Sequence, residues 1–363
     1  MKVALVHDYL IQDGGAERVL LALHEMYPDA PIFTLFHNPE RLHPDFRRCD
    51  IRPSRLNALP FATTHYQWYL PFMPQAIEAF DLSGYDLVLS SSSSFAKGVL
   101  AAPHAIHICY CHTPTRFLWQ DRIGYISELP QPALIKRLLP HFMHRLRVWD
   151  RLVADRPDVL LTNSKTSQNR IRRYYRRETE VIHPPVDVSI IPVATGPGNY
   201  WLAGGRLVAY KRFDLVVSAF AKLDLPLKVF GIGPELEKLK RLAGPNTEFL
   251  GRVDEKVKHE LFQHAIAFFY PHVEDFGITA VEAMAAGRPV IAYRDGGATE
   301  TVIDGVSGQF LDAQTREAIE KAVRDFDPSR YNPTLVRQVA EPFAKHLFQE
   351  KMREVIRKAM EKT

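Results

Sequence analysis

Two carboxylates stand eight positions apart in the stretch VEDFGITAVEAMAAGRPV, residues 273–290. Glu274 precedes a Phe-Gly pair, and Glu282 falls inside the helix that the following residues predict. Residues eight apart on one continuous helix differ by about 80° in direction, so the two acids would share a face poorly. A loop-plus-helix arrangement would instead let them hold different parts of one ligand that is rich in hydroxyl groups. The ordinary alternative is a helix with two solvated glutamates.

The residues between these acids suit an anion. Phe276 and Gly277 end the expected loop, and the helix would begin at Ile278. The N–H groups of Gly277, Ile278 and Thr279 would then face a negatively charged group, because the N-terminus of a helix carries partial positive charge. The order acid, helix N-terminus, acid matches the sugar, phosphate and ribose of a nucleotide-sugar.

Two cations frame another loop, in GGRLVAYKRFD, residues 204–214. Arg206 and Lys211 follow the end of an apolar run and precede a helical pattern. An arginine binds two oxygens at once and a lysine supplies a point charge, so this pair beside two glycines suits a diphosphate. The alternative is an ordinary loop that happens to end in cations.

A second glycine pair, Gly14 and Gly15, lies in DGGAE between the first apolar run and a helical pattern. Glycines let the backbone pass close to a ligand, and the helix that follows would offer free N–H groups. A plain tight turn is the alternative. The chain lacks the G-x-G-x-x-G fingerprint at this point, which disfavours a dinucleotide-dependent dehydrogenase.

The elements that must position these residues alternate along the chain. Short, continuous apolar runs are typical of strands buried on both faces of a parallel sheet. Helical patterns separate them, for example residues 16–27, where apolar residues fall on one stripe. This alternation predicts an α/β, doubly wound architecture. The expected strands are residues 2–7, 85–93, 107–112, 158–164, 200–205, 227–233, 247–251, 265–272 and 289–297.

The series of strands starts twice, which predicts two Rossmann-like domains. Residues 1–182 would form the first domain and residues 199–340 the second, with a Pro- and Gly-rich linker over 183–198. Residues 341–363 predict a C-terminal helix that packs back on the first domain. Ligands of parallel sheets bind beyond the carboxyl ends of the strands, so we expect the two sheets to face each other across one cleft.

Composition places the chain among soluble proteins of the cytoplasm. No apolar run approaches the length of a transmembrane helix, and the N-terminal run is too short for a signal peptide. Three cysteines do not make a disulfide framework. Residues 136–177 hold twelve Lys and Arg against three acids. This block is either a pair of solvated helices or a surface for an anionic membrane or substrate, whereas nucleic acid is disfavoured because no recognised module is present.

A cluster of histidine and cysteine invites a metal interpretation in HAIHICYCH, residues 104–112. His107, Cys109 and Cys111 alternate on one strand face but lack the spacing of a zinc module, which favours buried small residues. His112 has the opposite parity and lies at the strand end, where it would face a ligand. The motif DFD at residues 325–327 lies away from any strand end, so it does not predict a metal site either.

Several segments together resemble one enzyme family. EDFGITAVEAM resembles the E-x7-E motif of retaining glycosyltransferases of the GT-B, family 4 group, and GGRLVAYKRFD resembles their G-R-L-x-x-x-K-[GR]-x-D segment. ICYCHTPTRFLW, residues 108–119, resembles a segment of the bacterial mannosyltransferase-like branch. The motifs agree in order and spacing, and the resemblance spans nearly the whole chain.

The resemblance implies a role for each matching residue. Glu274 would hold hydroxyls of the transferred sugar, and Glu282 would hold the nucleotide ribose. Arg206 and Lys211 would neutralise the diphosphate as it leaves, without a metal ion or other cofactor. Gly15, with Gly14, would bring backbone N–H groups near the same phosphates.

In the first domain the resemblance implies that His112 lies against the donor sugar. Ser94 and Lys97 follow a strand end in a serine-rich loop, where they would contact acceptor or donor or would simply form a loop. Arg116 belongs to the family-like segment and is a third candidate for contact with the acceptor.

The implied reaction moves a hexose, mannose from GDP-mannose, to a saccharide or polyprenyl-linked acceptor in polysaccharide or lipopolysaccharide synthesis. The protein would work in the cytoplasm or on the inner face of the plasma membrane. A UDP- or ADP-sugar donor and a nucleotide-sugar epimerase of the same fold are alternatives within enzymes. A phosphorylase would need a pyridoxal-binding lysine that the sequence does not place. A nucleotide-sugar-binding scaffold without catalysis is the alternative of another class.

Overall fold

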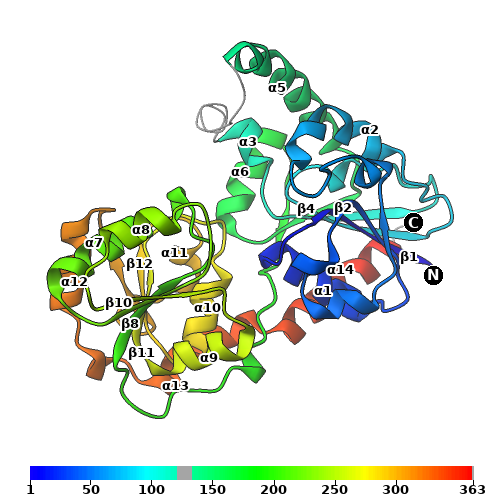
Figure 1. Ribbon diagram of the computed structural model, residues 1–363. Helices are drawn as coiled ribbons and strands as arrows, with labels where there is room; N and C mark the ends of the chain where they lie inside the picture. The colour runs from blue at the N-terminus through cyan, green and yellow to red at the C-terminus, as the bar shows by residue number, and fades with distance from the viewer. Residues whose placement is uncertain (121–132, 362–363) are drawn as a thin grey trace. The chain divides into compact units, whose positions relative to one another are not determined.

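The computed structural model describes residues 1–120 and 133–361, with side chains of residues 133–138 left out. The chain forms two compact units (Figure 1). The first contains Met1–Pro185 together with Phe348–Thr363, and the second contains Val186–Leu347. Each unit is built around a parallel sheet, which confirms the predicted α/β class with two Rossmann-like sheets.

The sheet of the first unit has seven strands in the order β3-β2-β1-β4-β5-β6-β7, and every neighbouring pair is parallel. Its central strands are buried on both faces, as their continuous apolar sequences require. The strands are β1 (Val3–Leu10), β2 (Ile32–His37), β3 (Ile51–Pro53), β4 (Leu87–Ser92), β5 (Ile106–Cys111), β6 (Val159–Thr162) and β7 (Glu180–Val181).

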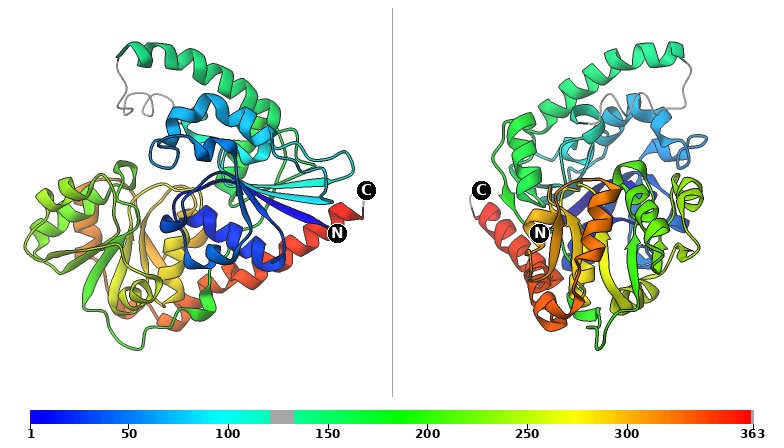
Figure 2. Two further views of the ribbon diagram at one scale, coloured as in Figure 1. Left: turned by 45° about the vertical axis from the view of Figure 1, so that its right-hand side comes forward. Right: turned by 90° about the vertical axis from the view of Figure 1, so that its left-hand side faces the viewer.

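Helices cover both faces of this sheet (Figure 2). One face packs against α1 and α14, and the other packs against α2, α5 and α6. Apolar residues of α14 such as Phe348 and Met352 are buried there, so the C-terminal helix completes the first unit. The helices are α1 (Gly15–Met26), α2 (Met73–Glu78), α3 (Arg116–Trp119), α5 (Ala133–Val153), α6 (Lys165–Tyr175) and α14 (Lys345–Met360), with 3-10 turns η1 (Pro39–Arg41), η2 (Pro44–Arg48), η3 (Arg55–Ala58), η4 (Tyr66–Phe72) and η5 (Ala96–Gly98).

The sheet of the second unit repeats the same strand order, β10-β9-β8-β11-β12-β13, again all parallel. Its strands carry the aromatic core of this unit, in which Phe268 and Phe269 point to opposite faces. The strands are β8 (Tyr200–Gly204), β9 (Leu227–Phe230), β10 (Thr247–Gly251), β11 (Ala265–Tyr270), β12 (Val290–Tyr293) and β13 (Gly308–Leu311).

Two layers of helices sandwich this second sheet. The helices α7, α8 and α12 pack on one face, and α9, α10, α11 and α13 pack on the other. Their bounds are α7 (Phe213–Leu223), α8 (Leu236–Leu242), α9 (Glu255–His264), α10 (Ile278–Ala285), α11 (Ala298–Thr301), α12 (Arg316–Arg324) and α13 (Pro333–Ala340), with 3-10 turns η6 (Val188–Ile190), η7 (Ala209–Lys211), η8 (Pro328–Arg330) and η9 (Glu341–Phe343).

Most of the segment expected to be a linker, residues 183–198, belongs to the second unit. Val186, Val188 and Ile191 are buried in its core. The Arg337 guanidinium of α13 donates hydrogen bonds to the carbonyl oxygens of Val188 (2.8 Å) and Ile191 (2.6 Å). Buried valine and isoleucine side chains and satisfied carbonyl groups therefore fix this segment on the unit that follows it.

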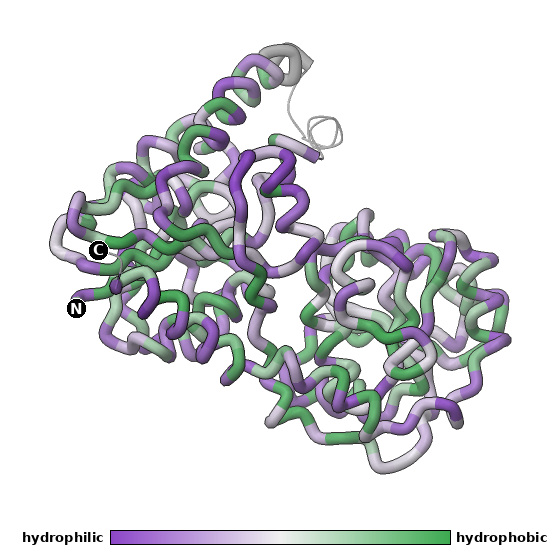
Figure 3. Tube along the Cα trace, turned by 180° about the vertical axis from the view of Figure 1, so that it is seen from behind, coloured by the Kyte–Doolittle hydropathy of each residue, from purple (hydrophilic) through white to green (hydrophobic). Residues whose placement is uncertain are grey.

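Four strands fall outside the apolar runs that the sequence singled out: β2, β3, β7 and β13. Of these, β3, β7 and β13 are short and lie at sheet edges. In Figure 3 the chain is coloured mostly as hydrophobic along the central strands, whereas hydrophilic and hydrophobic residues alternate along α5. None of the helices in residues 1–120 and 133–361 is long and apolar enough to cross a membrane.

Candidate functional site

Many of the candidate functional residues follow strand ends near one particular place in each sheet. Both sheets reverse their strand order between two neighbouring strands, β1 and β4 in the first unit and β8 and β11 in the second. Loops that leave such a pair at its carboxyl end diverge to opposite faces, and this point is where parallel α/β sheets bind ligands. In the second unit, Ala203 of β8 pairs with Phe269 of β11, so the loops that follow these strands emerge side by side.

In the second unit the structure brings Lys211 and Glu274 into direct contact. The Lys211 Nζ lies 2.9 Å from the Glu274 Oε1, although the two residues come from different strand-end loops. Lys211 is buried and the Glu274 side chain is 23% exposed, so a ligand can reach the carboxylate. The proposed diphosphate cation and the proposed sugar-binding acid thus share one site.

Tyr270, at the end of β11, and His272, just after it, also lie against the Glu274 carboxylate. The Tyr270 hydroxyl donates a 2.7 Å hydrogen bond to Glu274 Oε2, and His272 Nε2 lies 3.5 Å from Oε1. The His272 ring packs on Tyr270 with centroids 4.1 Å apart. Sequence reasoning missed both residues, because an apolar strand that ends in Tyr and His gives no sign of which acid it supports.

The electrostatics of this cluster keep Glu274 ionised. Burial alone would raise the pKa of Glu274, but the Lys211 charge and hydrogen bonds from its neighbours lower it well below the usual value. Burial lowers the pKa of His272, which is therefore neutral. Burial and the adjacent Glu274 charge raise the pKa of Tyr270 well above 10, so its hydroxyl remains a donor.

Glycine is required at the turn between Glu274 and α10. Gly277 caps α10 with a φ of 96°, a left-handed conformation that side chains rarely adopt. A Cβ at this position would lie 2.7 Å from the Tyr270 hydroxyl. The loop is also backed by Gly297, whose N–H donates to the Glu274 carbonyl at 2.8 Å. This packing explains the Phe-Gly and Asp-Gly-Gly elements on either side of the helix.

The other members of the motif take different positions. The Phe276 side chain is buried in the core and packs edge-on against Phe343, so only its backbone faces the loop. Ile278 and Thr279 form the first turn of α10, where N–H groups have no partner within the helix. Arg206 follows β8 and is exposed to solvent.

Glu282 lies in the second turn of α10 and meets a cation from α9. Its Oε1 is 2.9 Å from the Nζ of Lys258, which is also 3.0 Å from Glu255 Oε1. Lys258 was not among the residues that the sequence singled out, because a lysine in an amphipathic helix is ordinarily a surface residue.

In the first unit, Gly14 lies in the turn after β1 and Gly15 begins α1. Gly14 is the N-cap of α1 in an extended conformation, and a Cβ there would lie 3.0 Å from the Glu17 carboxylate. Glu17 is buried, with its Oε1 3.7 Å from the His7 Nε2 of β1. Glycine at this turn therefore leaves room for a buried acid behind the loop.

His112 follows β5 and is 8% exposed. Its Nε2 lies 2.9 Å from the hydroxyl of Ser91 at the end of β4. Burial, with a smaller contribution from nearby His7, lowers the pKa of His112 to about 3. The imidazole is consequently neutral at physiological pH and acts as a hydrogen-bonding group rather than a charge.

The serine-rich loop after β4 is held by an aspartate of β1. The Asp8 carboxylate accepts four backbone N–H groups, those of residues 93 to 96, at 2.6–2.8 Å. Ser94 is buried within this loop and its carbonyl oxygen accepts a hydrogen bond from the Lys97 ammonium. The loop is thus a fixed structure rather than an open surface of hydroxyl groups.

Lys97 was a candidate for contact with acceptor or donor, with a plain loop as the alternative, and the structure buries it completely. Its side chain is 1% exposed, and its Nζ lies 2.6 Å from Asp150 Oδ1 of α5. The same carboxylate accepts hydrogen bonds from Thr115 (2.6 Å), Trp119 (2.7 Å) and Tyr175 (2.8 Å). This buried ion pair and its hydrogen bonds join four segments of the first unit. The Lys97 ammonium group is shielded from solvent.

The basic block, residues 136–177, lies on α5, α6 and their connection. The side chains of Lys136 and Arg137 lie outside the described residues. Several others bind protein groups: Arg156 pairs with Glu78, Arg172 pairs with Glu178, and Arg177 donates to the carbonyl oxygens of Ala154 and Pro157. Part of this charge is therefore paired with groups of the protein itself. Arg116, the third acceptor candidate, begins α3 and is half-buried.

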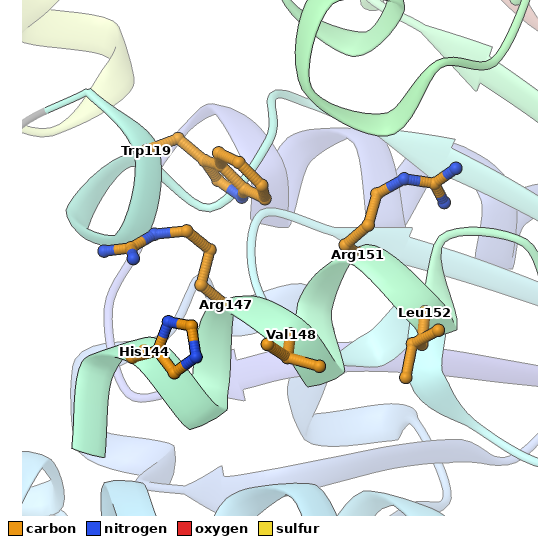
Figure 4. A pocket seen from close by; sticks show the side chains of 6 residues that line it. All are labelled: Trp119, His144, Arg147, Val148, Arg151 and Leu152. Carbon is orange, nitrogen blue, oxygen red and sulfur yellow. The ribbon is translucent and has the colours of Figure 1, made fainter. Parts of the chain in front are cut away.

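A shallow hollow of about 290 Å³ lies between α3 and α5. Figure 4 shows the Trp119 ring across from Arg147 and Arg151, which project from α5. The Arg147 Nε donates to the Leu118 carbonyl at 2.8 Å. Guanidinium groups beside apolar surface suit an anion that is carried on an apolar body. The lining residues are Trp119, His144, Arg147, Val148, Arg151 and Leu152.

The histidine and cysteine residues of β5 have structural surroundings. Cys109 and Cys111 are buried free thiols, and burial raises the pKa of Cys109 to about 12. His107 Nε2 lies 2.8 Å from the Ser90 hydroxyl. The aspartates of DFD cap or follow helices, as Asp327 does for η8. Within residues 1–120 and 133–361, no group of three or more His, Cys, Asp or Glu is arranged to hold a metal ion.

Family models match both units. The model described as "Glycosyltransferase Family 4" matches residues 13–190, and the model described as "Glycosyl transferases group 1" matches residues 193–329. The chain belongs to glycosyltransferase family 4. This assignment confirms the resemblance that the E-x7-E segment and the Arg206–Lys211 loop carry.

Curated relatives match at modest identity. The D-rhamnosyltransferase WbpZ of Pseudomonas aeruginosa is 30% identical over 247 residues, which cover 59% of this chain and 62% of that protein. The GDP-mannose-dependent alpha-(1-6)-phosphatidylinositol monomannoside mannosyltransferase of Mycolicibacterium smegmatis is 38% identical over 149 residues, 34% of this chain and 38% of that protein. The alpha-1,3/1,6-mannosyltransferase alg-2 of Neurospora crassa is 25% identical over 354 residues, 91% of this chain and 65% of that protein. The chain spans less than two thirds of the length of each of these three.

Solved structures share the fold over the full chain. HepE of Anabaena, in complex with UDP and glucose, has a TM-score of 0.72 at 18% identity, covering 98% of this chain and 99% of that one. Sucrose-phosphate synthase of Thermosynechococcus elongatus has a TM-score of 0.75 at 17% identity, covering 100% of both chains. At this identity the likeness concerns the fold, which is the predicted GT-B fold.

Proposed function

We propose that the protein is a retaining glycosyltransferase that moves a hexose, mannose from GDP-mannose, to a saccharide or lipid-linked saccharide acceptor. The observation that carries this proposal is the contact of Lys211 with Glu274 at the ligand-binding edge of the second sheet, beside the N-terminus of α10. Relatives named as mannosyltransferases support mannose, and one of them is named as GDP-mannose-dependent. A neighbour that binds UDP and glucose supports a nucleotide-sugar donor in general.

The residues of the second unit divide the donor among themselves. Lys211, Arg206 and the free N–H groups of Ile278 and Thr279 would bind the diphosphate. Glu274 would accept hydrogen bonds from sugar hydroxyls, and its low pKa keeps both oxygens available as acceptors. Glu282 would accept from the ribose hydroxyls. Each role rests on residue chemistry and on the family resemblance.

In the transfer step, the acceptor oxygen forms a bond to the anomeric carbon as the bond from that carbon to the diphosphate oxygen breaks. The diphosphate leaves with the electron pair and takes the proton of the acceptor hydroxyl. Negative charge grows on the leaving group, and fixed cations stabilise it most where they need not reorganise. Lys211 and Arg206 would supply this stabilisation without a metal ion. His112, as a neutral imidazole, would hydrogen-bond the transferred sugar.

The acceptor side belongs to the first unit in this proposal. The hollow at Trp119, Arg147 and Arg151 combines guanidinium groups with exposed apolar residues of α5. This combination favours an acceptor that joins a phosphate to a lipid, and a working place on the anionic inner face of the plasma membrane. Such an acceptor fits polysaccharide or lipopolysaccharide synthesis.

Calorimetry of the full chain with GDP, UDP and ADP, each with its mannose or glucose derivative, tests the proposal. GDP should bind most tightly, mannose on the nucleotide should strengthen binding, and EDTA should change neither. Lys211→Met should lower turnover by about 10²–10³-fold, the usual effect of losing one group that stabilises a developing anion. Lys256→Met, an exposed lysine of the same unit, is the matched control and should behave as wild type.

The other outcomes separate the alternatives. Preference for UDP or ADP would keep the fold and mechanism but replace the sugar. Conversion of the nucleotide-sugar without any acceptor would indicate an epimerase. Tight binding with unchanged function in Lys211→Met would favour a scaffold, and no nucleotide binding by the wild type would refute the enzyme proposal.

A further inference from the structure

Lys258 is a half-buried lysine that pairs with two carboxylates. Its side chain is 14% exposed and lies on α9, where Asp254 caps the helix by accepting the Val257 N–H at 2.8 Å. Burial would lower the pKa of Lys258, but the charges of Glu282 and Glu255 raise it above its usual value. The ammonium group is therefore charged, and its neighbours are two carboxylates.

The contact with Glu282 has a consequence for what that acid can bind. Among the described residues, Lys258 is the only recorded partner of the Glu282 carboxylate, and it takes one position on Oε1 at 2.9 Å. A carboxylate offers about four acceptor positions. Oε2 and the rest of Oε1 therefore stay available to two further donors, and the Glu282 side chain is 13% exposed.

We infer that Lys258 is a positioning residue that holds the Glu282 carboxylate in the orientation that receives the two hydroxyls of a nucleotide ribose. This inference rests on the proposed function, which assigns the ribose to Glu282. Glu255, on the same helix, binds the Lys258 ammonium group with a second carboxylate, and Asp254 caps the start of that helix. The Glu282 side chain would then already be in its binding conformation before the nucleotide binds.

Removal of Lys258 has a specific expected effect. Without the ammonium group, Glu282 and Glu255 lie near each other with no cation between them, and the Glu282 side chain must be ordered by the ligand. The cost of ordering one such side chain corresponds to a loss of up to about tenfold in affinity. The loss should be largest for ligands that engage Glu282 through both ribose hydroxyls.

Calorimetry of the full chain with GDP and 2′-deoxy-GDP, and in parallel with UDP and 2′-deoxy-UDP, tests this inference. Wild type should bind the ribonucleotide about tenfold or more tightly than the deoxy form, because a hydrogen bond to a charged group is lost. In Lys258→Met the ribonucleotide should weaken about tenfold and the deoxy form, which keeps only the 3′-hydroxyl, clearly less, so that the preference falls. Lys256→Met, on the exposed side of the same helix, should keep the wild-type preference.

Several results would overturn the inference. Equal weakening of both nucleotides in Lys258→Met would indicate general damage to the site, and an unchanged preference would show that Glu282 needs no support. A wild type that binds nucleotides without ribose preference would remove the role of Glu282, whereas a wild type that binds no nucleotide would refute the proposed function itself. If Lys258→Met does not fold, Lys258→Gln keeps a neutral donor on a side chain that is one bond shorter and should show an intermediate preference, and a full wild-type preference would contradict the inference.

Discussion

Replacement of Lys97 by methionine should destabilise the first unit strongly. The side chains of Lys97 and Asp150 are each 1% exposed, and Nζ and Oδ1 lie 2.6 Å apart. Lys97→Met keeps most of the aliphatic volume and removes only the charge. It leaves a buried carboxylate whose remaining donors, Thr115, Trp119 and Tyr175, are neutral.

The expected magnitude follows from that geometry. Breaking a buried ion pair by removing one partner costs about 3–5 kcal/mol, because the other charge stays uncompensated. Three neutral hydrogen bonds to Asp150 persist, so the lower end, about 3 kcal/mol, is expected. In the double variant Lys97→Met/Asp150→Asn no charge remains buried, and its cost should fall short of the sum of the single costs by about 1–3 kcal/mol.

Urea unfolding followed by tryptophan fluorescence measures this effect. In a Trp201→Phe background the remaining tryptophans, Trp68, Trp119 and Trp149, all belong to the first unit, so the signal reports that unit alone. Lys2→Met, an exposed lysine of the same unit, is the control. A Lys97→Met stability within about 0.5 kcal/mol of wild type, together with lost turnover, would refute the structural role and restore Lys97 as a ligand-binding residue.

Two further predictions concern the turn at α10 and the histidines of β5. Gly277→Ala places a Cβ 2.7 Å from the Tyr270 hydroxyl at a φ of 96°, so it should cost about 1–3 kcal/mol and weaken donor binding; calorimetry that finds wild-type affinity would contradict the geometry. Burial lowers the pKa of His107 to about 4 and that of His112 to about 3, so the stability they contribute is complete above pH 6.5 and is lost as pH falls toward those values. Each histidine should lower the free energy of unfolding by about 1.4 kcal/mol per pH unit as pH falls below 6.5, and His107→Gln should remove its own share of that slope in urea titrations between pH 7 and 5; an unchanged slope would show that the pKa of His107 is not lowered in the folded state.

The architecture could be predicted from sequence because it depends on local patterns. Runs such as AIAFFY are too apolar for an exposed strand, and their alternation with helical stripes requires a parallel sheet with helices on both faces. The short edge strands β3, β7 and β13 were not predicted, because two to four residues are too few to show a strand pattern. Val186 to Ile191 looked like a linker because prolines and small residues hide the valines that are buried.

The site could be predicted only in part, for a different reason. Motif positions such as Glu274, Lys211 and Glu282 are visible in sequence, and their ligand roles stay predictions. Which groups surround them is set by tertiary packing. Lys97 looks like a loop cation in sequence, yet the fold brings Asp150 to it from a helix far along the chain. Lys258 looks like a surface cation, yet α9 lies beside α10.

The two acids of the E-x7-E motif share a feature that their spacing does not reveal. Each is paired at 2.9 Å with a lysine from another element, Glu274 with Lys211 and Glu282 with Lys258. Such pairing offsets part of the desolvation cost of two half-buried carboxylates in one unit. The pairs would nevertheless respond differently to a nucleotide-sugar. A diphosphate would compete with Glu274 for Lys211 and free a carboxylate oxygen for the sugar, whereas Lys258 would keep its hold on Glu282. Under the proposed function, the Glu274–Lys211 pair would therefore open when the donor binds, and the Glu282–Lys258 pair would persist.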